Sequence, residues 1–426
     1  MHEDPTREPR AVPESLWRLS RFRNLWLAQT VSLLGTQFTL VAFPLVALLL
    51  DASASDIGLL FAIEFAPILL LGLPAGAWVE RLPLRAVLLV SDGARAAALA
   101  VVPIAWAFGL LSMPVLFAVA FVIGVGTLFF DVAQMSILPE LLTDDQLADG
   151  NAKLEGSRSF AQLGGPTAGG FVVQWVSAPI AVLVDAISYG LSFVFLLLVR
   201  DRARPRAVVP ESKGLGKEIA EGVRFVRSHP VLAPLAVCDA LANLGFAAVL
   251  ALQVFYGAQV LGLSAGAIGA VLAIGNLGGL VGAVASGPLS RRIAPGRLLI
   301  GSVVVFTAGA VLLPMATGFL GFGLGLFVAY FGVVVYNVTQ VTLRQVLTPE
   351  HLLSRTNATL RFIEWGTLPV GAALGGFLAG PIGLRGVLWA SAAVCALSLL
   401  PALVKPVRSL ALPADDAPAL EPQEAS

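Results

Sequence analysis

Five carboxylic acids interrupt long apolar stretches of the sequence: Glu64, Asp131, Asp185, Asp239 and Glu364. An acid at the centre of a bilayer costs about 2.5–3.5 kcal/mol unless it is paired or faces water. Burial can keep such a carboxyl protonated, and contact with water lets it ionise. The pattern therefore indicates proton coupling, for which Glu64, Asp131, Asp239 and Glu364 are the candidates.

The stretches around these acids have the length and composition of membrane spans. Of the 426 residues, 57% are hydrophobic and only 13% are charged, whereas a soluble domain has about 25% charged residues. This surplus excludes a soluble enzyme, a nucleic-acid-binding protein and a disordered scaffold. A span needs about 20 apolar residues. The sequence predicts an all-α membrane protein with twelve spans, at 23–50, 57–79, 84–109, 113–135, 156–178, 180–199, 231–259, 266–289, 297–316, 318–343, 357–380 and 384–404.

The basic residues predict the sidedness of these spans. With twelve spans, Arg385 alone falls in a loop on the side opposite the termini. Lys and Arg concentrate on the cytoplasmic side of membrane proteins, so both termini are expected in the cytoplasm of a multi-pass inner-membrane protein. The predicted parts are a cytoplasmic segment (1–22), a six-helix bundle (23–199), a cytoplasmic linker (200–230), a second six-helix bundle (231–404) and a disordered cytoplasmic tail (405–426).

The two six-span halves repeat each other in sequence. Asn151-Ala152-x-Leu154 recurs as Asn357-Ala358-x-Leu360, and Gly169-Gly170-Phe171 recurs as Gly375-Gly376-Phe377, both with an offset of 206 residues. Each half starts and ends on the same side, which indicates parallel repeats about an axis along the membrane normal. Transporters built this way rock one bundle against the other around a central site.

Several short sequence motifs lie in the predicted spans and in the loop after the second span. The loop after the second span reads GAWVERLPLR from Gly76 to Arg85, and the fifth span contains GPTAGG from Gly165 to Gly170. With Phe129-Phe130-Asp131 and the run from Ser91 to Ala96, they resemble the major facilitator superfamily, in its enterobactin-exporter-like and macrolide-efflux-like branch. The fourth span has no basic residue at 113–135, unlike many drug/proton antiporters of that family.

The resemblance implies two structural devices. A cytoplasmic gate would place Glu80 against the start of the eleventh span, near Thr356 and Asn357, with Arg95 bridging to Glu80. Its expected residues are Gly76, Glu80, Arg81, Arg85, Asp92 and Arg95. The alternatives are membrane anchoring for Arg81 and Arg85 and structural pairing for Asp92 and Arg95. An antiporter-type helix contact, or simple close packing, is expected at Gly165, Pro166, Gly169, Gly170, Gly375 and Gly376.

The resemblance also implies a central cavity lined by spans 1, 2, 4, 5, 7, 8, 10 and 11. Asp185, on the sixth span, is then expected to be structural, and Arg361 could hold Glu364 as a static ion pair. Polar and aromatic side chains on the lining spans are the candidates for substrate contact: Gln37, Phe61, Phe65, Phe129, Asn243, Phe246, Gln253, Phe255, Tyr256, Asn276, Asn337, Gln340 and Trp365.

No sequence pattern of an enzyme, cofactor site or metal site is present. Cys238 and Cys395 lie in apolar runs, the three histidines are far apart, and a phosphate-binding Gly-x-x-x-x-Gly-Lys loop is missing. We therefore expect a proton-coupled exporter of a hydrophobic or amphipathic small molecule such as a drug, antibiotic or siderophore. Its partners would be the substrate, protons and membrane lipids, without nucleic acid, and it would be a monomer. A symporter or lysophospholipid translocator of the same fold, and a non-transporting receptor or assembly partner, are the alternatives.

Overall fold

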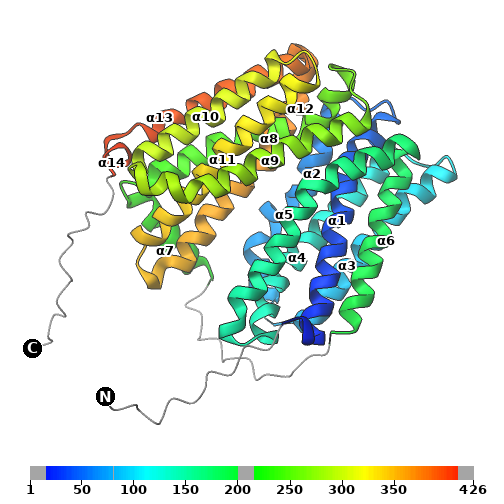
Figure 1. The fold of residues 1–426 in the computed structure, drawn as a ribbon, viewed down its shortest axis with the longest axis horizontal. Helices are drawn as coiled ribbons and strands as arrows, with labels where there is room; N and C mark the ends of the chain where they lie inside the picture. The colour runs from blue at the N-terminus through cyan, green and yellow to red at the C-terminus, as the bar shows by residue number, and fades with distance from the viewer. Residues whose placement is uncertain (1–15, 80, 200–214, 411–426) are drawn as a thin grey trace, which may run out of the picture.

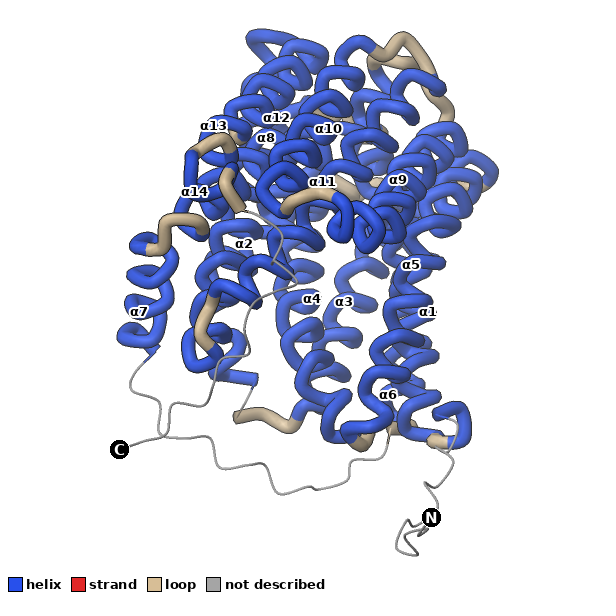
Figure 2. The backbone as a smooth tube through the Cα atoms, turned by 60° about the vertical axis from the view of Figure 1, so that its left-hand side comes forward, coloured by secondary structure: helices blue, strands red, loops and turns tan. Residues whose placement is uncertain are grey.

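The computed structural model describes residues 16–79, 81–199 and 215–410. This part of the chain is helical and contains no strand (Figures 1 and 2). Its elements are η1 (Leu16–Arg18), α1 (Ser20–Leu48), α2 (Ala54–Val79), α3 (Leu84–Ala107), α4 (Met113–Leu141), α5 (Asp144–Trp175), α6 (Ala178–Leu197), α7 (Leu215–Ser228), α8 (Leu232–Gln259), α9 (Ala265–Arg292), α10 (Pro295–Met315), α11 (Phe319–Leu347), α12 (Glu350–Leu397), α13 (Leu399–Ala402) and α14 (Lys405–Arg408).

The fold contains the twelve predicted spans. Ten helices of the described chain are long and apolar enough to cross a membrane. One of them, α12, is 48 residues long and is broken at Gly383, which has a positive φ of 73°, so it supplies two spans. The twelfth is α5, which does not meet the same apolar criterion and whose charged residues lie in its first half.

The helices form two bundles. The N-terminal half contains α1–α6 and the C-terminal half contains α8–α13, and the two bundles lie side by side (Figure 1). We call the side where α1 begins and α14 lies the terminal face, and the other side the opposite face. The packing within each bundle is dominated by apolar side chains, as membrane helices of this composition require.

The halves contact each other near the opposite face. Helix α2 packs on α12, and α5 packs on α9. A Cβ on Gly58 of α2 would lie 2.5 Å from the carbonyl oxygen of Ala372, and one on Gly376 would lie 2.8 Å from that of Ala54. Only glycine permits backbones to approach this closely. The bundles are thus joined through backbone contacts at one end of their helices, and Figure 1 shows them diverging toward the other.

The linker and the tail contain more structure than the sequence predicted. The linker includes helix α7, which rests on α12 through Gly222 and an ion pair between Glu221 and Arg355. The predicted tail starts at 405, yet α14 forms there with Val407 fully buried, so that boundary was wrong. Packing on α10 orders this turn, because the N–H of Gly296 donates to the carbonyl of Leu410 at 3.4 Å. Residues 411–426 lie outside the described residues.

His229 organises the junction between α7 and α8. Its Nδ1 accepts hydrogen bonds from the backbone N–H groups of Val231 and Leu232, both at 3.2 Å. These are orphan donors at the start of a helix, and only a ring unprotonated at Nδ1 can accept them. Partial burial lowers the pKa of His229 below its usual 6.5. The neutral ring is therefore the form that fits this helix start.

We predict a pH-dependent contribution of His229 to stability. Because the folded pKa is lowered, the contribution is complete above about pH 6.5 and is lost as the pH falls below that value toward the folded pKa. His229→Asn keeps an acceptor that does not titrate, whereas His229→Ala loses it at every pH and should cost about 1 kcal/mol. Apparent melting temperatures in detergent, measured over a pH series, test this. Equal pH slopes for the wild type and His229→Asn would contradict it.

Candidate functional site

Two of the predicted acids gather in the C-terminal half. Asp239 on α8 is 4% exposed, and its Oδ2 accepts a hydrogen bond of 2.9 Å from Nε2 of Gln340 on α11. One turn further along α11, Arg344 contacts Glu364 of α12 at 3.5 Å. Arg344 also interacts electrostatically with Asp239. Three helices therefore bring two carboxyls to one guanidinium, and we call Asp239, Gln340, Arg344 and Glu364 the C-half cluster.

The ion partner within 4.0 Å of Glu364 is Arg344, whereas Arg361 is exposed and interacts with Glu364 electrostatically. Sequence reasoning missed Arg344 because it lies near the end of a span, where an arginine looks like a membrane anchor. Its side chain is only 8% exposed. The available signal was its spacing: Arg344 follows Gln340 by four residues, which places both on one face of the helix.

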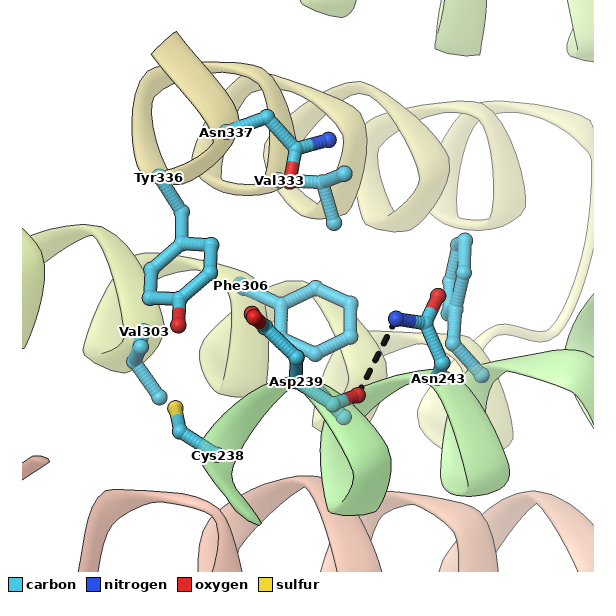
Figure 3. A pocket seen from close by; sticks show the side chains of 10 residues that line it. Cys238, Asp239, Asn243, Val303, Phe306, Val333, Tyr336 and Asn337 are labelled. Atoms are coloured by element: carbon cyan, nitrogen blue, oxygen red, sulfur yellow. Dashed lines mark hydrogen bonds between the residues drawn. The ribbon is translucent and has the colours of Figure 1, made fainter. Parts of the chain in front are cut away.

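A small polar pocket adjoins the cluster. It has a volume of about 60 Å³ and lies between α8, α10 and α11. Asn243, Phe246 and Asn337, all predicted to line the substrate cavity, line this pocket with Asp239 instead. Figure 3 shows the Tyr336 hydroxyl pointing toward Cys238 and Asp239, and the side-chain amide of Asn243 donating to the backbone carbonyl of Asp239 at 3.0 Å. The pocket is large enough for a few water molecules and too small for a drug-sized molecule.

The N-terminal half contains a second buried ion pair. Asp92 and Arg95 of α3 contact each other and are 0% and 4% exposed. Ser192 of α6 donates to the other oxygen of Asp92, and the guanidinium of Arg95 lies 4.2 Å from the ring centre of Tyr189. These partners come from outer helices of the bundle. The pair therefore locks α3 to α6, as the structural alternative expected.

The other candidate acids have different surroundings. Glu64 on α2 is half-buried, and Asp185 on α6 is 1% exposed. Asp131 on α4 is exposed and interacts electrostatically with Arg158 of its own half and with Arg361 of the C-terminal half. Asp131 therefore faces the other bundle, on the terminal-face side of the contacts between the halves.

The gate residues that lie in the described chain do not form one contact. Glu80 lies outside the described residues, as does its proposed bridge to Arg95. Arg81 is exposed. Arg85 donates to the carbonyls of Leu196 and Leu197 at 3.1 and 2.6 Å, so it holds the last turn of α6. At Gly76 a Cβ would meet nothing within 4 Å. The described part of this loop is thus attached to its own half.

The glycine motifs divide between two kinds of contact. Gly165 and Gly169 of α5 pack against Gln37 and Phe38 of α1, within the N-terminal half, and Gly375 packs against Ala248 within the C-terminal half. Gly170 meets the backbone of Ala265, the carbonyl of Pro166 meets Gly269, and Gly376 meets α2. The second set joins the halves near the opposite face.

The remaining cavity candidates are scattered. Phe61 and Phe65 stack with ring centres 4.5 Å apart. Asn276 donates to the carbonyl of Gln162 at 2.6 Å, across the halves. Trp365 is 41% exposed, and Gln253 is 4% exposed.

Two of the aromatic candidates are buried, and a third lines a groove. Phe255 and Tyr256 are 7% and 0% exposed and belong to the apolar cores. Phe129 lies parallel to Trp78 at 6.3 Å and lines an apolar groove of about 530 Å³ between α3 and α4. Sequence gives the helix of such a residue but not the face on which it lies. A prediction of twelve spans therefore does not identify the residues that line a cavity.

Comparison with known proteins agrees with this architecture. The chain is 29% identical over 373 residues to the multidrug efflux pump Tap of Mycolicibacterium fortuitum, covering 82% of this chain and 87% of the relative. It is 30% identical to Tap of Mycobacterium tuberculosis over 372 residues, covering 82% and 85%. The enterobactin exporter EntS of Citrobacter koseri matches at 32% identity over 226 residues, covering 50% of this chain and 51% of EntS.

Solved structures share the fold. A bacterial homologue of the iron transporter ferroportin, in an inward-facing state, superposes with a TM-score of 0.75 at 17% identity, over 93% of this chain and 100% of that one. The sequence model of the Major Facilitator Superfamily matches residues 25–364. With its multiple apolar helices in two bundles, the chain belongs to the major facilitator superfamily of membrane transporters, which are not enzymes.

Proposed function

We propose that this transporter is a proton-coupled exporter of amphipathic small molecules and that the C-half cluster binds the coupling proton. The observation that carries the proposal is that Asp239 and Glu364 share one buried guanidinium, Arg344, while Arg361, which also interacts electrostatically with Glu364, is exposed. With both carboxyls ionised, the cluster would have one uncompensated negative charge in a medium of low dielectric constant. One proton removes that charge, so the cluster has room for one exchangeable proton.

The geometry links this proton to motion of the bundles. Glu364 belongs to α12, the helix that also packs on α2 of the other half. Its side chain is 22% exposed, whereas that of Arg344 is 8% exposed. Rocking of the halves about their opposite-face contacts would alter the access of water to Glu364. A carboxyl that meets water on one side of the cycle and is enclosed on the other can take up and release its proton in turn.

The energy available is sufficient for export. One elementary charge that crosses a potential of 100 mV releases about 2.3 kcal/mol. A difference of about 1.4 kcal/mol corresponds to a factor of ten, so one proton supports roughly a fifty-fold substrate gradient. Similarity to a multidrug efflux pump and to an enterobactin exporter supports outward transport. Aromatic side chains such as Phe61, Phe65 and Trp365 suit cargo with apolar surface.

The proposed orientation places the terminal face in the cytoplasm. Arg18 and Arg23 flank the start of α1, Arg291 and Arg292 end α9, and Lys405 and Arg408 lie in α14. All belong to the terminal face, and cytoplasmic loops carry the excess of Lys and Arg. The bundles, joined near the opposite face, would therefore be arranged to admit cargo from the cytoplasm.

The proton assignment predicts a specific defect. In reconstituted vesicles with ethidium as the amphipathic probe, Asp239→Asn and Glu364→Gln should reduce proton-driven accumulation. Ethidium exchange at equilibrium should continue, because a neutral amide imitates the protonated acid. Asp149→Asn is the matched control, since Asp149 pairs with Lys153 on the surface of α5. Full proton-driven accumulation in both cluster variants would contradict the assignment.

The shared guanidinium predicts an energetic coupling between Arg344 and Glu364. Arg344→Gln leaves two carboxyls without their cation and should destabilise the protein by roughly 1–3 kcal/mol, less than the 3–5 kcal/mol of a fully buried pair because Glu364 is 22% exposed. In the double variant with Glu364→Gln much of this loss should return. Unfolding in detergent measures the cycle, and additive effects of the two substitutions would argue against the cluster.

The orientation can be tested by labelling. Both native cysteines, Cys238 and Cys395, are buried, so the background is low. A thiol reagent that cannot cross membranes should label Ser112→Cys, at the start of α4, in intact cells. It should label Ser409→Cys, after α14, only once the cells are broken. The reverse pattern would show that the terminal face is external.

A further inference from the structure

A polar seam runs between α1 and α6 inside the N-terminal half. On α6, Asp185, Ser188, Tyr189 and Ser192 are spaced so that all four lie on one helix face, and their exposed fractions are between 0% and 6%. A polar stripe on an outer membrane helix is unfavourable unless its groups form hydrogen bonds with other polar groups. The stripe therefore needs partners inside the bundle.

Helix α1 supplies those partners. The Thr36 and Tyr189 hydroxyls are 2.9 Å apart, and the buried Thr39 hydroxyl, which has no hydrogen-bond partner in the described chain, lies near the Asp185 carboxyl. Gly35 allows the two helices to meet: a Cβ there would lie 2.6 Å from Oδ1 of Asp185. The close approach of α1 thus encloses Asp185.

Asp185 is the buried acid of this half that has only hydroxyl contacts. Ser188 Oγ donates to its Oδ1 at 2.9 Å. In the described chain no Lys, Arg or His nitrogen lies within 4.0 Å of Asp185 or of Glu64. The guanidinium nearest to them in the bundle, that of Arg95, contacts Asp92.

The charges around Asp185 do not balance. The ionisable groups facing it are Glu64 on α2, Asp92 and Arg95 on α3, and Tyr189 on α6. Once Arg95 and Asp92 have neutralised each other, two carboxyls remain without a cation. A buried charge without a cation is strongly unfavourable, whereas a neutral carboxyl needs only ordinary hydrogen bonds. The Ser188 hydroxyl supplies such a bond at Asp185.

Polar groups line the seam beyond Asp185. Ser188 is bonded to Asp185, and a second group of contacts joins Thr36 to Tyr189, which also accepts from Arg95 of the Arg95–Asp92 pair. Each hydroxyl can donate one hydrogen bond and accept another. Nearer the terminal face, Gln29 of α1 is bonded to Gln134 of α4 at 3.1 Å, so the polar groups continue along α1 toward the end of the bundle.

We propose that Asp185 is a second proton-binding site, located in the N-terminal half and reached along the seam between α1 and α6. Proton binding at Asp185 does not depend on transport, whereas the contribution of Asp185 to coupling rests on the proposed function. The assignment replaces the purely structural role expected from its place on an outer helix. Each half then contains its own proton site: Asp185 with Glu64 in one, and the C-half cluster in the other.

Infrared difference spectroscopy of the full-length protein in lipid, over an acid-to-alkaline pH series, tests the site. Protonated carboxyls have a carbonyl stretch that carboxylates lack. Asp185→Asn should lose one such band, and Ser188→Ala should shift that band because it removes the hydrogen bond to Oδ1. Asp149→Asn, at an exposed and ion-paired acid, is the matched control and should leave the band in place. A band unchanged in both Asp185→Asn and Ser188→Ala overturns the proposal. The Ser188→Ala variant decides the question by itself if Asp185→Asn fails to fold.

Vesicle transport then separates this proposal from the proposed function. With ethidium as the probe, Asp185→Asn should reduce the number of protons moved per ethidium by one, while Glu364→Gln removes the proton of the other half. A wild-type protein that moves ethidium without protons, yet shows the Asp185 band, contradicts coupled transport and leaves the proton site standing. An unchanged proton-to-ethidium ratio in Asp185→Asn, with the wild type coupled, overturns the role of Asp185 in coupling.

Discussion

The scarcity of cations inside the bundles is the constraint on which the rest of the structure depends. Among the described residues, each half encloses one ion-paired guanidinium, Arg95 or Arg344, among a larger number of carboxyls. Isolated charges are costly in a medium that cannot solvate them. The surplus carboxyls must therefore meet water, as Glu364 partly does, or hold a proton. Helix packing, the polar stripes and the exposure of particular acids all follow from this condition, since each helps to keep uncompensated charge out of the apolar interior.

The repeat in the sequence shows how two similar halves acquire different chemistry. At the 206-residue offset, Glu155 and Arg158 of α5 correspond to Arg361 and Glu364 of α12, with the signs of charge exchanged. In α5 the two residues lie 3.9 Å apart, on the surface of the helix. In α12 the acid turns instead to Arg344 of α11. One backbone plan thus carries a solvated pair in one half and a buried, shared cation in the other.

Most of the fold could be predicted from the sequence, whereas the site could be predicted only in part. Apolar length and the distribution of Arg and Lys define the spans because the bilayer imposes both on every helix. No comparable rule says which side of a helix meets which neighbour. Arg344 was therefore read as an anchor, and Tyr256 as a cavity residue although it is fully buried. Asp185 was assigned a structural role from its helix alone, because its hydroxyl partners and Gly35 on α1 become neighbours only in the folded bundle.

The joint between the halves is made of close glycine contacts. Gly58, Gly170, Gly269 and Gly376 bring backbone against backbone near the opposite face, and at these four positions no side chain separates the halves. Small-residue contacts of this kind favour a few close-packed arrangements. In the proposed cycle, a modest rotation about this joint would change which of the candidate acids meet water. A close backbone contact could thus govern the solvation of carboxyls on both sides of it, and proton binding and motion would then be two aspects of one equilibrium.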